Sequence, residues 1–205
     1  MPNGIPEKSF RYFIINKPRD MVSQFVSPDP VRLLGALDFD FPEGIHAVGR
    51  LDNESEGLLI LTNNKKVTRL LFSANEPHRR VYLVQINHVL SDDNLQKLRE
   101  GVAIKIEGGE QYITPPCEVN RIDSPEIIYP FIKTTEQYGA HSWITIALYE
   151  GKFRQVRKMV KAINHRCKRL IRITIEDLEL GNLPPGEVKE IDEKVFFNLL
   201  KINNF

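Results

Sequence analysis

An uninterrupted apolar run, "LLIL" at residues 58–61, lies between Gly57 and Thr62, directly after a turn rich in charged residues. A strand with one face in water alternates apolar and polar side chains, whereas a short continuous apolar run is typical of a strand buried on both faces. The run therefore predicts a central strand covered on both sides. The preceding turn, "GRLDNESEG", then places carboxylates at the end of a buried strand.

The rest of the chain predicts strands mixed with a few helices. The best-marked helix follows Ser91, a residue type favoured at helix N-caps, and ends at Gly101. Further strands are expected over residues 11–16, 21–25, 80–90, 142–151 and 169–180, and helices over 31–37, 63–73, 154–164 and 193–202. Because these elements do not alternate strictly, the pattern indicates an α+β fold.

The cysteine content and the lack of long apolar segments indicate the cellular compartment of the protein. The 205 residues include only two cysteines, Cys117 and Cys167, which are too far apart for a CxxC pair, so a disulfide scaffold is not expected. Residues 1–13 lack the apolar core of a signal peptide, and no apolar run approaches the roughly 20 residues of a membrane helix. We expect a cytoplasmic protein without a membrane partner.

The net charge of +1 conceals a strongly basic segment. Residues 151–172 contain nine Lys or Arg and no Asp or Glu, so the remainder carries 19 basic and 27 acidic residues, or −8. A single positive segment in an otherwise acidic chain favours an anionic partner on one face, with nucleic acid as the leading candidate. The alternative is a basic helix that is merely solvated.

Asp52 is the first candidate for chemistry. A carboxylate beside an apolar strand loses solvation unless a cation lies near it, and Arg50, Arg154 and Arg157 are the available cations. An aspartate held ionised by arginine is usable as a nucleophile or base. The alternative is an aspartate that only caps a turn. Asp52 with Glu56 would also resemble the two carboxylates of a glycosidase, although Glu56 in a turn is more simply a solvated residue.

Tyr82 is the second candidate, because a strand tyrosine near Arg79 and Arg80 can stack on a planar base and exchange a proton. The alternative is ordinary core packing. The five histidines are scattered, no nucleophile arrangement, phosphate-binding loop or dinucleotide signature occurs, and no cofactor or metal is expected.

Three segments in order resemble the signature motifs of RNA pseudouridine synthases of the RsuA branch: "GRLDNESEGLLILTN", "RRVYLVQI" and "LYEGKFRQVRKM". "NKPRDMVSQF" resembles the Lys-Pro segment that opens their catalytic domain, and "LIRITIEDLELGNLPPGE" the segment after the third motif. The resemblance implies an extension over residues 1–9 and a catalytic domain of two sub-lobes over residues 10–205, without an S4 domain. It also implies a mixed, mostly antiparallel sheet flanked by helices and loops, with the catalytic cleft across its middle.

The resemblance further implies roles for individual residues. Asp52 matches the catalytic aspartate, Arg157 the basic residue paired with it, and Tyr82 the tyrosine that stacks on the target base. Val156 matches an aliphatic pocket residue and Arg50 the position that holds the flipped nucleotide out of the RNA helix. Arg80 stands where many relatives have Lys. The remaining residues expected to contact RNA are Lys17, Lys152, Arg154, Lys158 and Lys161.

The implied reaction converts a uridine of large-subunit (23S) ribosomal RNA to pseudouridine, with Asp52 either attacking C1′ or removing a proton from C2′. It detaches the base, turns it and rejoins it to the same sugar, so no cofactor is required. The expected partner is ribosomal RNA, with pre-ribosomal particles a further candidate, and the protein is expected to be a monomer. The alternatives are a transfer RNA substrate or a non-catalytic RNA-binding protein of ribosome assembly.

Overall fold

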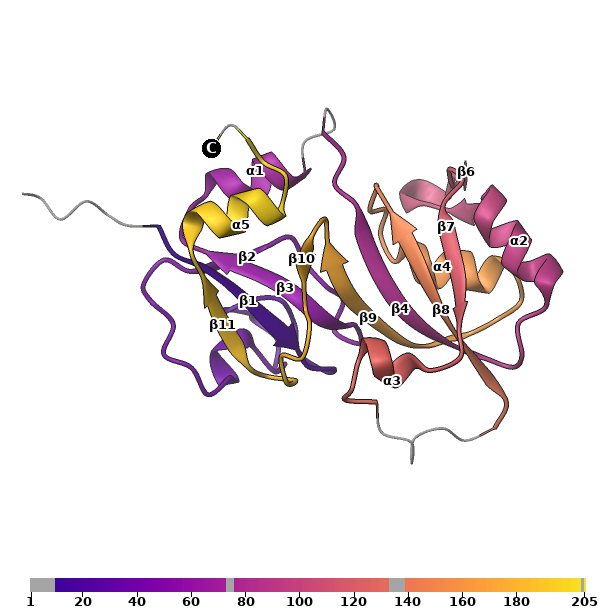
Figure 1. The fold of residues 1–205 in the computed structure, drawn as a ribbon, viewed down its shortest axis with the longest axis horizontal. Coiled ribbons are helices and arrows are strands. Elements are labelled where there is room, and N and C mark those ends of the chain that lie inside the picture. Colours follow the sequence, from indigo (N-terminus) through magenta and orange to yellow (C-terminus); the bar gives the residue numbers. More distant parts are fainter. Residues whose placement is uncertain (1–9, 73–75, 133–138, 204) are drawn as a thin grey trace, which may run out of the picture.

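The computed structural model describes residues 10–72, 76–132, 139–203 and 205. Within them a nine-stranded sheet has the order β11-β1-β3-β9-β4-β8-β7, with β2 added beside β3 and β10 beside β9 (Figure 1). The strands of this sheet are β1 (Tyr12–Lys17), β2 (His46–Val48), β3 (Glu56–Thr62), β4 (Arg80–Asn87), β7 (Glu118–Ile122), β8 (His141–Leu148), β9 (Cys167–Ile175), β10 (Leu178–Glu179) and β11 (Val188–Ile191). A separate two-stranded sheet joins β5 (Ala103–Lys105) and β6 (Gln111–Ile113).

Five α-helices lie around the sheet within the described residues: α1 (Lys66–Phe72), α2 (Asp92–Glu100), α3 (Pro125–Ile128), α4 (Gln155–Ala162) and α5 (Glu193–Leu199). Two short 3-10 helices, η1 (Leu34–Ala36) and η2 (Glu107–Gly109), lie in the loops. The pairing is antiparallel except between β3 and β9. The expected α+β class, with a mixed and mostly antiparallel sheet, is confirmed.

The predicted central strand, β3, is buried over all seven of its residues. It pairs with β1 on one edge, while its other edge is shared between β2 and β9. The core behind it is divided between the two sheet faces: Leu59 and Leu61 pack with Phe13 and Ile15, whereas Leu58 and Ile60 face the cluster that includes Phe196. Burial on both faces explains the absence of polar residues within the run.

The sheet is narrowest where β3 meets β9. These parallel strands pair only through Glu56 with Ile171 and Gly57 with Arg172. Gly57 has a φ of +98°, and a Cβ added there would lie 2.3 Å from the Arg172 carbonyl oxygen, so only glycine permits this approach. The sheet halves on either side of this junction are visible in Figure 1, with β1, β3 and β11 on one side and β4, β7 and β8 on the other.

Residue types that favour helix N-caps do cap two of the helices. Ser91 caps α2 by accepting a hydrogen bond from the Asn94 amide, and Asn64 accepts one from the Lys66 amide at the start of α1. The expected strand over residues 21–25 is wrong, because this segment is irregular: the Val22 amide donates to the Arg32 carbonyl rather than to a neighbouring strand. Strand β11 and helix α3 were not expected. The expected N-terminal extension, residues 1–9, lies outside the described residues.

Candidate active site

Asp52 lies on a tight turn between β2 and β3, at the junction of the two sheet halves. The Ser55 amide donates to the Asp52 carbonyl at 2.9 Å, which closes the turn. The residues on both sides of Asp52 are held by the segment that follows β1. The Ser23 hydroxyl lies 3.0 Å from both the amide nitrogen and the carbonyl oxygen of Leu51, and the Asp20 amide donates to the Asn53 carbonyl at 2.9 Å. The backbone of the turn is therefore fixed before any ligand binds.

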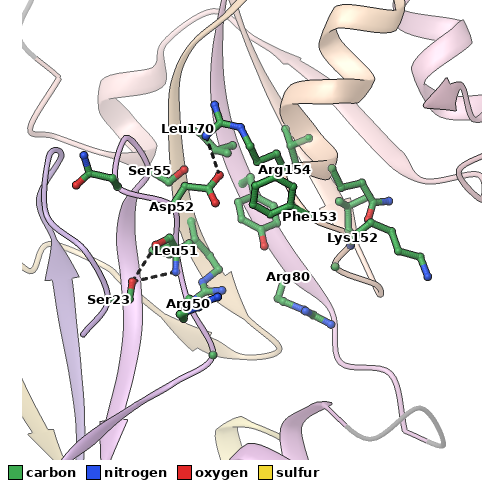
Figure 2. Close-up of a pocket in the computed structure, with 18 of the residues that line it drawn as sticks. Ser23, Arg50, Leu51, Asp52, Ser55, Arg80, Lys152, Phe153, Arg154 and Leu170 are labelled. Carbon is green, nitrogen blue, oxygen red and sulfur yellow. Dashed lines mark hydrogen bonds and ion pairs between the residues drawn. The ribbon is translucent and has the colours of Figure 1, made fainter. Parts of the chain in front are cut away.

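Two arginines of the third motif face the Asp52 carboxylate. Its Oδ2 lies 3.9 Å from Nη1 of Arg154 and 3.9 Å from Nε of Arg157, and Figure 2 shows the carboxylate turned toward Arg154. Arg154 is the N-cap of α4 and adopts the left-handed conformation (φ 54°, ψ 34°), which is uncommon outside glycine. The Asp52 side chain is 27% exposed, so it is accessible from one side.

Arg157 is more enclosed than Arg154, with 10% of its side chain exposed. Its Nη2 donates to the Ser55 hydroxyl at 3.3 Å and its Nη1 lies 3.4 Å from Glu54 Oε2. The buried Nε has no hydrogen-bond partner within the described structure, although it points to Asp52. Arg157 therefore places a positive charge beside the Asp52 carboxylate.

A cavity of about 460 Å³ opens in front of Asp52. Tyr82 of β4 lies in its wall, and Leu148, Val156 and Leu170 supply apolar side chains that are each less than a tenth exposed. Residues of the first motif form the opposite wall (Figure 2). An aromatic ring and aliphatic side chains around one carboxylate suit a planar group with apolar faces and polar edges, such as a nucleobase.

Arg172 lies beside Tyr82. The two residues are cross-strand partners on β9 and β4, and both line the cavity. Arg172 is 3% exposed, and its burial lowers the pKa of the guanidinium below the ordinary value. Its Nε donates to the Leu58 carbonyl at 2.8 Å, while Nη2 is unsatisfied within the described residues. A buried arginine thus lies next to the tyrosine in the wall of the cavity.

The structure brings together most of the residues that the sequence singled out. Asp52 and Tyr82 line one cavity, and Arg157 reaches Asp52 from α4. The cavity is also lined by Arg50, Arg80, Lys152, Arg154 and Val156. Arg50 is exposed at the edge of the cavity, whereas Arg80 is only 8% exposed. Lys158 lies 5.4 Å from the ring centre of Phe153, and Lys161 lines a different pocket.

Lys17 does not lie where RNA could reach it. It is fully buried, and its Nζ donates to three backbone carbonyls, of Pro18, Met21 and Asn53. Burial lowers the pKa of this lysine to about 8, although the carboxylates of Glu56, Asp20 and Asp52 oppose the shift. The expectation that Lys17 contacts RNA is therefore corrected: through Asn53 this lysine holds the Asp52 turn.

Glu56 is not available as a second catalytic carboxylate. It is 6% exposed, and Arg169 donates to its two oxygens at 2.9 and 2.7 Å. It does not line the cavity in front of Asp52. Glu56 is also not the solvated turn residue that the sequence favoured, because it is the first residue of β3 and is buried against Arg169.

Five residues of the site that are discussed above were not identified from the sequence: Ser23, Leu148, Phe153, Leu170 and Arg172. Leu170 and Arg172 lie two residues apart on β9, which pairs with β4, the strand of Tyr82. The expected strand over residues 169–180 therefore contained a signal for both. Phe153 is 67% exposed between two cations, which is a signal typical of nucleic-acid contacts. For Ser23 there was no local signal, since its role depends on a contact 28 residues along the chain.

Among the described residues, no helix is long and apolar enough to cross a bilayer. Comparison with known proteins agrees with the geometry of the cavity. Residues 11–162 match the family model of RNA pseudouridylate synthases. The chain is 36% identical over 183 residues to ribosomal large subunit pseudouridine synthase E of Vibrio parahaemolyticus, covering 88% of this chain and 74% of that protein.

More distant similarities extend the same family. Ribosomal small subunit pseudouridine synthase A of Yersinia pestis is 29% identical over 182 residues, covering 88% of this chain and 69% of that protein. A crystal structure of a pseudouridylate synthase, 24% identical, superposes with a TM-score of 0.75 over 93% of this chain and 74% of that one, so the two share a fold. The chain belongs to the RNA pseudouridine synthases of the RsuA branch, and it is an isomerase.

Proposed function

We propose that this synthase converts a uridine of large-subunit ribosomal RNA to pseudouridine, with Asp52 acting at the sugar of the target nucleotide. The observation that carries the proposal is the shared cavity of Asp52 and Tyr82, with Arg157 on the Asp52 carboxylate. The ribosomal substrate is supported by the relatives, since the Vibrio protein named for the large subunit is more similar than the Yersinia protein named for the small subunit.

The side chains that line the cavity have different roles in the proposed reaction. A uracil ring against Tyr82 would have its sugar directed toward the turn that carries Asp52, because these residues line the same cavity of about 460 Å³. Arg154 and Arg157 lie beside the Asp52 carboxylate, which in its ionised form can either attack C1′ or remove the C2′ proton. Leu148, Val156 and Leu170 exclude water, so that water does not react with the sugar intermediate before the base rejoins it.

The target uridine must leave its base stack to reach this cavity, which costs a few kcal/mol. Arg50 is exposed at the edge of the cavity, where it can fill the place of the flipped base. Phe153 lies at the same edge with most of its ring exposed and can stack on a neighbouring base. Residues at such an edge can recognise the shape of an RNA stem-loop and its unstacked bases.

The experiment is pseudouridine mapping across ribosomal and transfer RNA from cells that lack this protein. We expect one or a few large-subunit positions to lose pseudouridine and to regain it when the wild-type gene is returned, but not when Asp52→Ala is returned. Loss at a small-subunit or transfer RNA position instead would overturn the large-subunit assignment. Restoration by Asp52→Ala would remove Asp52 from the chemistry, and no change at any position would indicate a non-catalytic role.

The two routes at the sugar are separated by an isotope effect. RNA with deuterium at C2′ of the target uridine is expected to react more slowly in a single turnover if Asp52 removes that proton in the slow step. Equal rates with both RNAs are expected if Asp52 attacks C1′.

A further inference from the structure

A second pocket, of about 850 Å³, lies on the other side of the Asp52 turn and is larger than the catalytic cavity. It opens where the first half of β9 separates from β3, between the start of β9, helix α4 and the segment after β1. Seven of its eleven lining residues are Lys or Arg, and one, Glu54, is acidic. We call it the basic pocket.

The basic pocket is continuous with the active site through the third motif. Arg154 lines both cavities, and Arg157 lines the basic pocket while its Nε lies 3.9 Å from Asp52. Glu54 lies between these arginines at 3.4 Å from each. A chain of anionic groups that enters the catalytic cavity can therefore continue into the basic pocket without crossing an apolar surface.

The positive charge of the pocket is only partly neutralised. Arg154 and Arg157 share Glu54 and Asp52, Arg169 is held by Glu56, and Arg19 lies 3.9 Å from Asp20. Among the described residues, these four acids pair with four of the seven cations and leave an excess of positive charge. In the described part of the chain, the exposed side chains of Lys161, Arg166 and Lys168 form no ion pair.

Clustered like charges repel one another, so a pocket with this excess is most stable when an anion occupies it. Arginine forks and lysine ammonium groups bind phosphate oxygens well. The pocket is lined almost throughout by polar groups, which suits a solvated, charged backbone rather than an inserted base. Its size relative to the catalytic cavity leaves room for more than one phosphate.

We infer that the basic pocket binds the phosphodiester backbone of the RNA strand next to the target uridine, with Lys161, Arg166 and Lys168 as the main contacts. The inference rests on the proposed function, because it assumes that the flipped uridine occupies the cavity at Asp52. It assigns a site for the flanking strand to residues that do not touch the reacting nucleotide.

The test compares two triple variants of the full chain. Lys161→Gln, Arg166→Gln and Lys168→Gln together remove the proposed contacts, and Lys65→Gln, Lys97→Gln and Lys105→Gln remove three exposed lysines that line neither pocket. Binding of a substrate stem-loop is measured by fluorescence anisotropy over a range of salt concentrations, and product formation is measured in single turnovers at saturating RNA. All six residues are exposed, so both variants are expected to fold, which thermal unfolding checks.

Each contact with a phosphate of single-stranded RNA contributes roughly 0.7 to the slope of log Kd against log salt concentration. The basic-pocket variant is therefore expected to lose about 2 from this slope and to bind RNA about tenfold or more weakly near 0.1 M salt. The control variant is expected to match wild type. The saturating single-turnover rate should be unchanged in both, because neither variant alters the catalytic cavity.

Shortened RNAs show whether the contact is direct. Removing the nucleotides on the side of the target uridine that enters the pocket should weaken binding by wild type and have no further effect on the basic-pocket variant. Equal affinity and equal salt slope in the two triple variants would overturn the inference even if wild type makes pseudouridine. Absence of pseudouridine formation by wild type would instead overturn the proposed function, since the binding measurement does not depend on turnover.

Discussion

The Ser23 hydroxyl holds Leu51 from both sides: it accepts a hydrogen bond from the Leu51 amide and donates one to the Leu51 carbonyl, each at 3.0 Å (Figure 2). Both residues are buried. Leu51 precedes Asp52, so this contact fixes the backbone from which the carboxylate projects.

Ser23→Ala is expected to lower both stability and activity. The variant leaves a buried amide and a buried carbonyl without partners, which costs on the order of 1–3 kcal/mol in the free energy of unfolding. The single-turnover rate is expected to fall at a temperature where the protein stays folded, because the Asp52 turn is less well positioned. Ser124→Ala, at a position without a side-chain cap hydrogen bond, is the matched control. Wild-type rate and stability in Ser23→Ala would show that the contact has no role.

The lowered pKa of Lys17 predicts how the free energy of unfolding depends on pH. Its pKa is about 8 in the folded protein and about 10.5 in the unfolded chain, so between these values the unfolded state binds more protons. Stability therefore rises with pH in this window: the cost of burying the charge is fully present below pH 8 and is relieved as pH rises through it. From pH 7 to 9 the gain in the free energy of unfolding is about 1 kcal/mol.

Urea unfolding at pH 7, 8 and 9 measures this gain, and Lys17→Met provides the comparison because methionine does not titrate. The difference in unfolding free energy between wild type and Lys17→Met should shift in favour of wild type as pH rises. A difference that is independent of pH would place the Lys17 pKa outside this range.

Arg172 and Tyr82 are expected to act as a unit. Arg172→Lys keeps the charge but loses the planar donor fork and its Nε donor to the Leu58 carbonyl, so the strand residue paired with Tyr82 is less well positioned. We expect the single-turnover rate to fall about tenfold or more. In a Tyr82→Phe background the same change should cost much less, and a double-mutant cycle measures the coupling. Fully additive effects on the single-turnover rate would show that the two residues act independently.

Glu56 and Arg169 form a structural pair at the start of β3. Glu56→Ala removes two charge-assisted hydrogen bonds from a mostly buried guanidinium and is expected to destabilise the protein by about 1.5–3 kcal/mol. At low temperature, where the variant remains folded, pseudouridine formation should persist. Complete loss of activity in a folded Glu56→Ala protein, or release of free uracil by wild type, would favour a two-carboxylate hydrolase instead.

Local patterns predicted the parts of the fold that local physics determines. The apolar run predicted β3, and the resemblance to the pseudouridine synthases, rather than a local pattern, implied that Asp52 would lie beside Arg157. Lys17 was misassigned because a lysine is usually exposed, and only the approach of three backbone carbonyls makes its burial possible.

Contacts between distant segments were beyond such patterns. Strand β11 pairs with β1, which lies near the other end of the sequence. No residue near 188–191 indicates this partner, so the strand at the edge of the sheet was not predicted. Residues 21–25 have an apolar, strand-like composition, yet Met21 fills the core and Ser23 braces Leu51, which leaves this segment irregular. The basic pocket likewise combines the segment after β1 with α4 and β9.

The most direct test of the account is the reaction of purified Asp52→Asn with large-subunit ribosomal RNA. Asparagine keeps the size of the side chain and removes the charge between Arg154 and Arg157. Pseudouridine mapping after a single turnover should detect no product, while the affinity for RNA stays within about threefold of wild type, a difference of less than 1 kcal/mol. Product at the wild-type rate and position would contradict the assignment of the chemistry to this carboxylate.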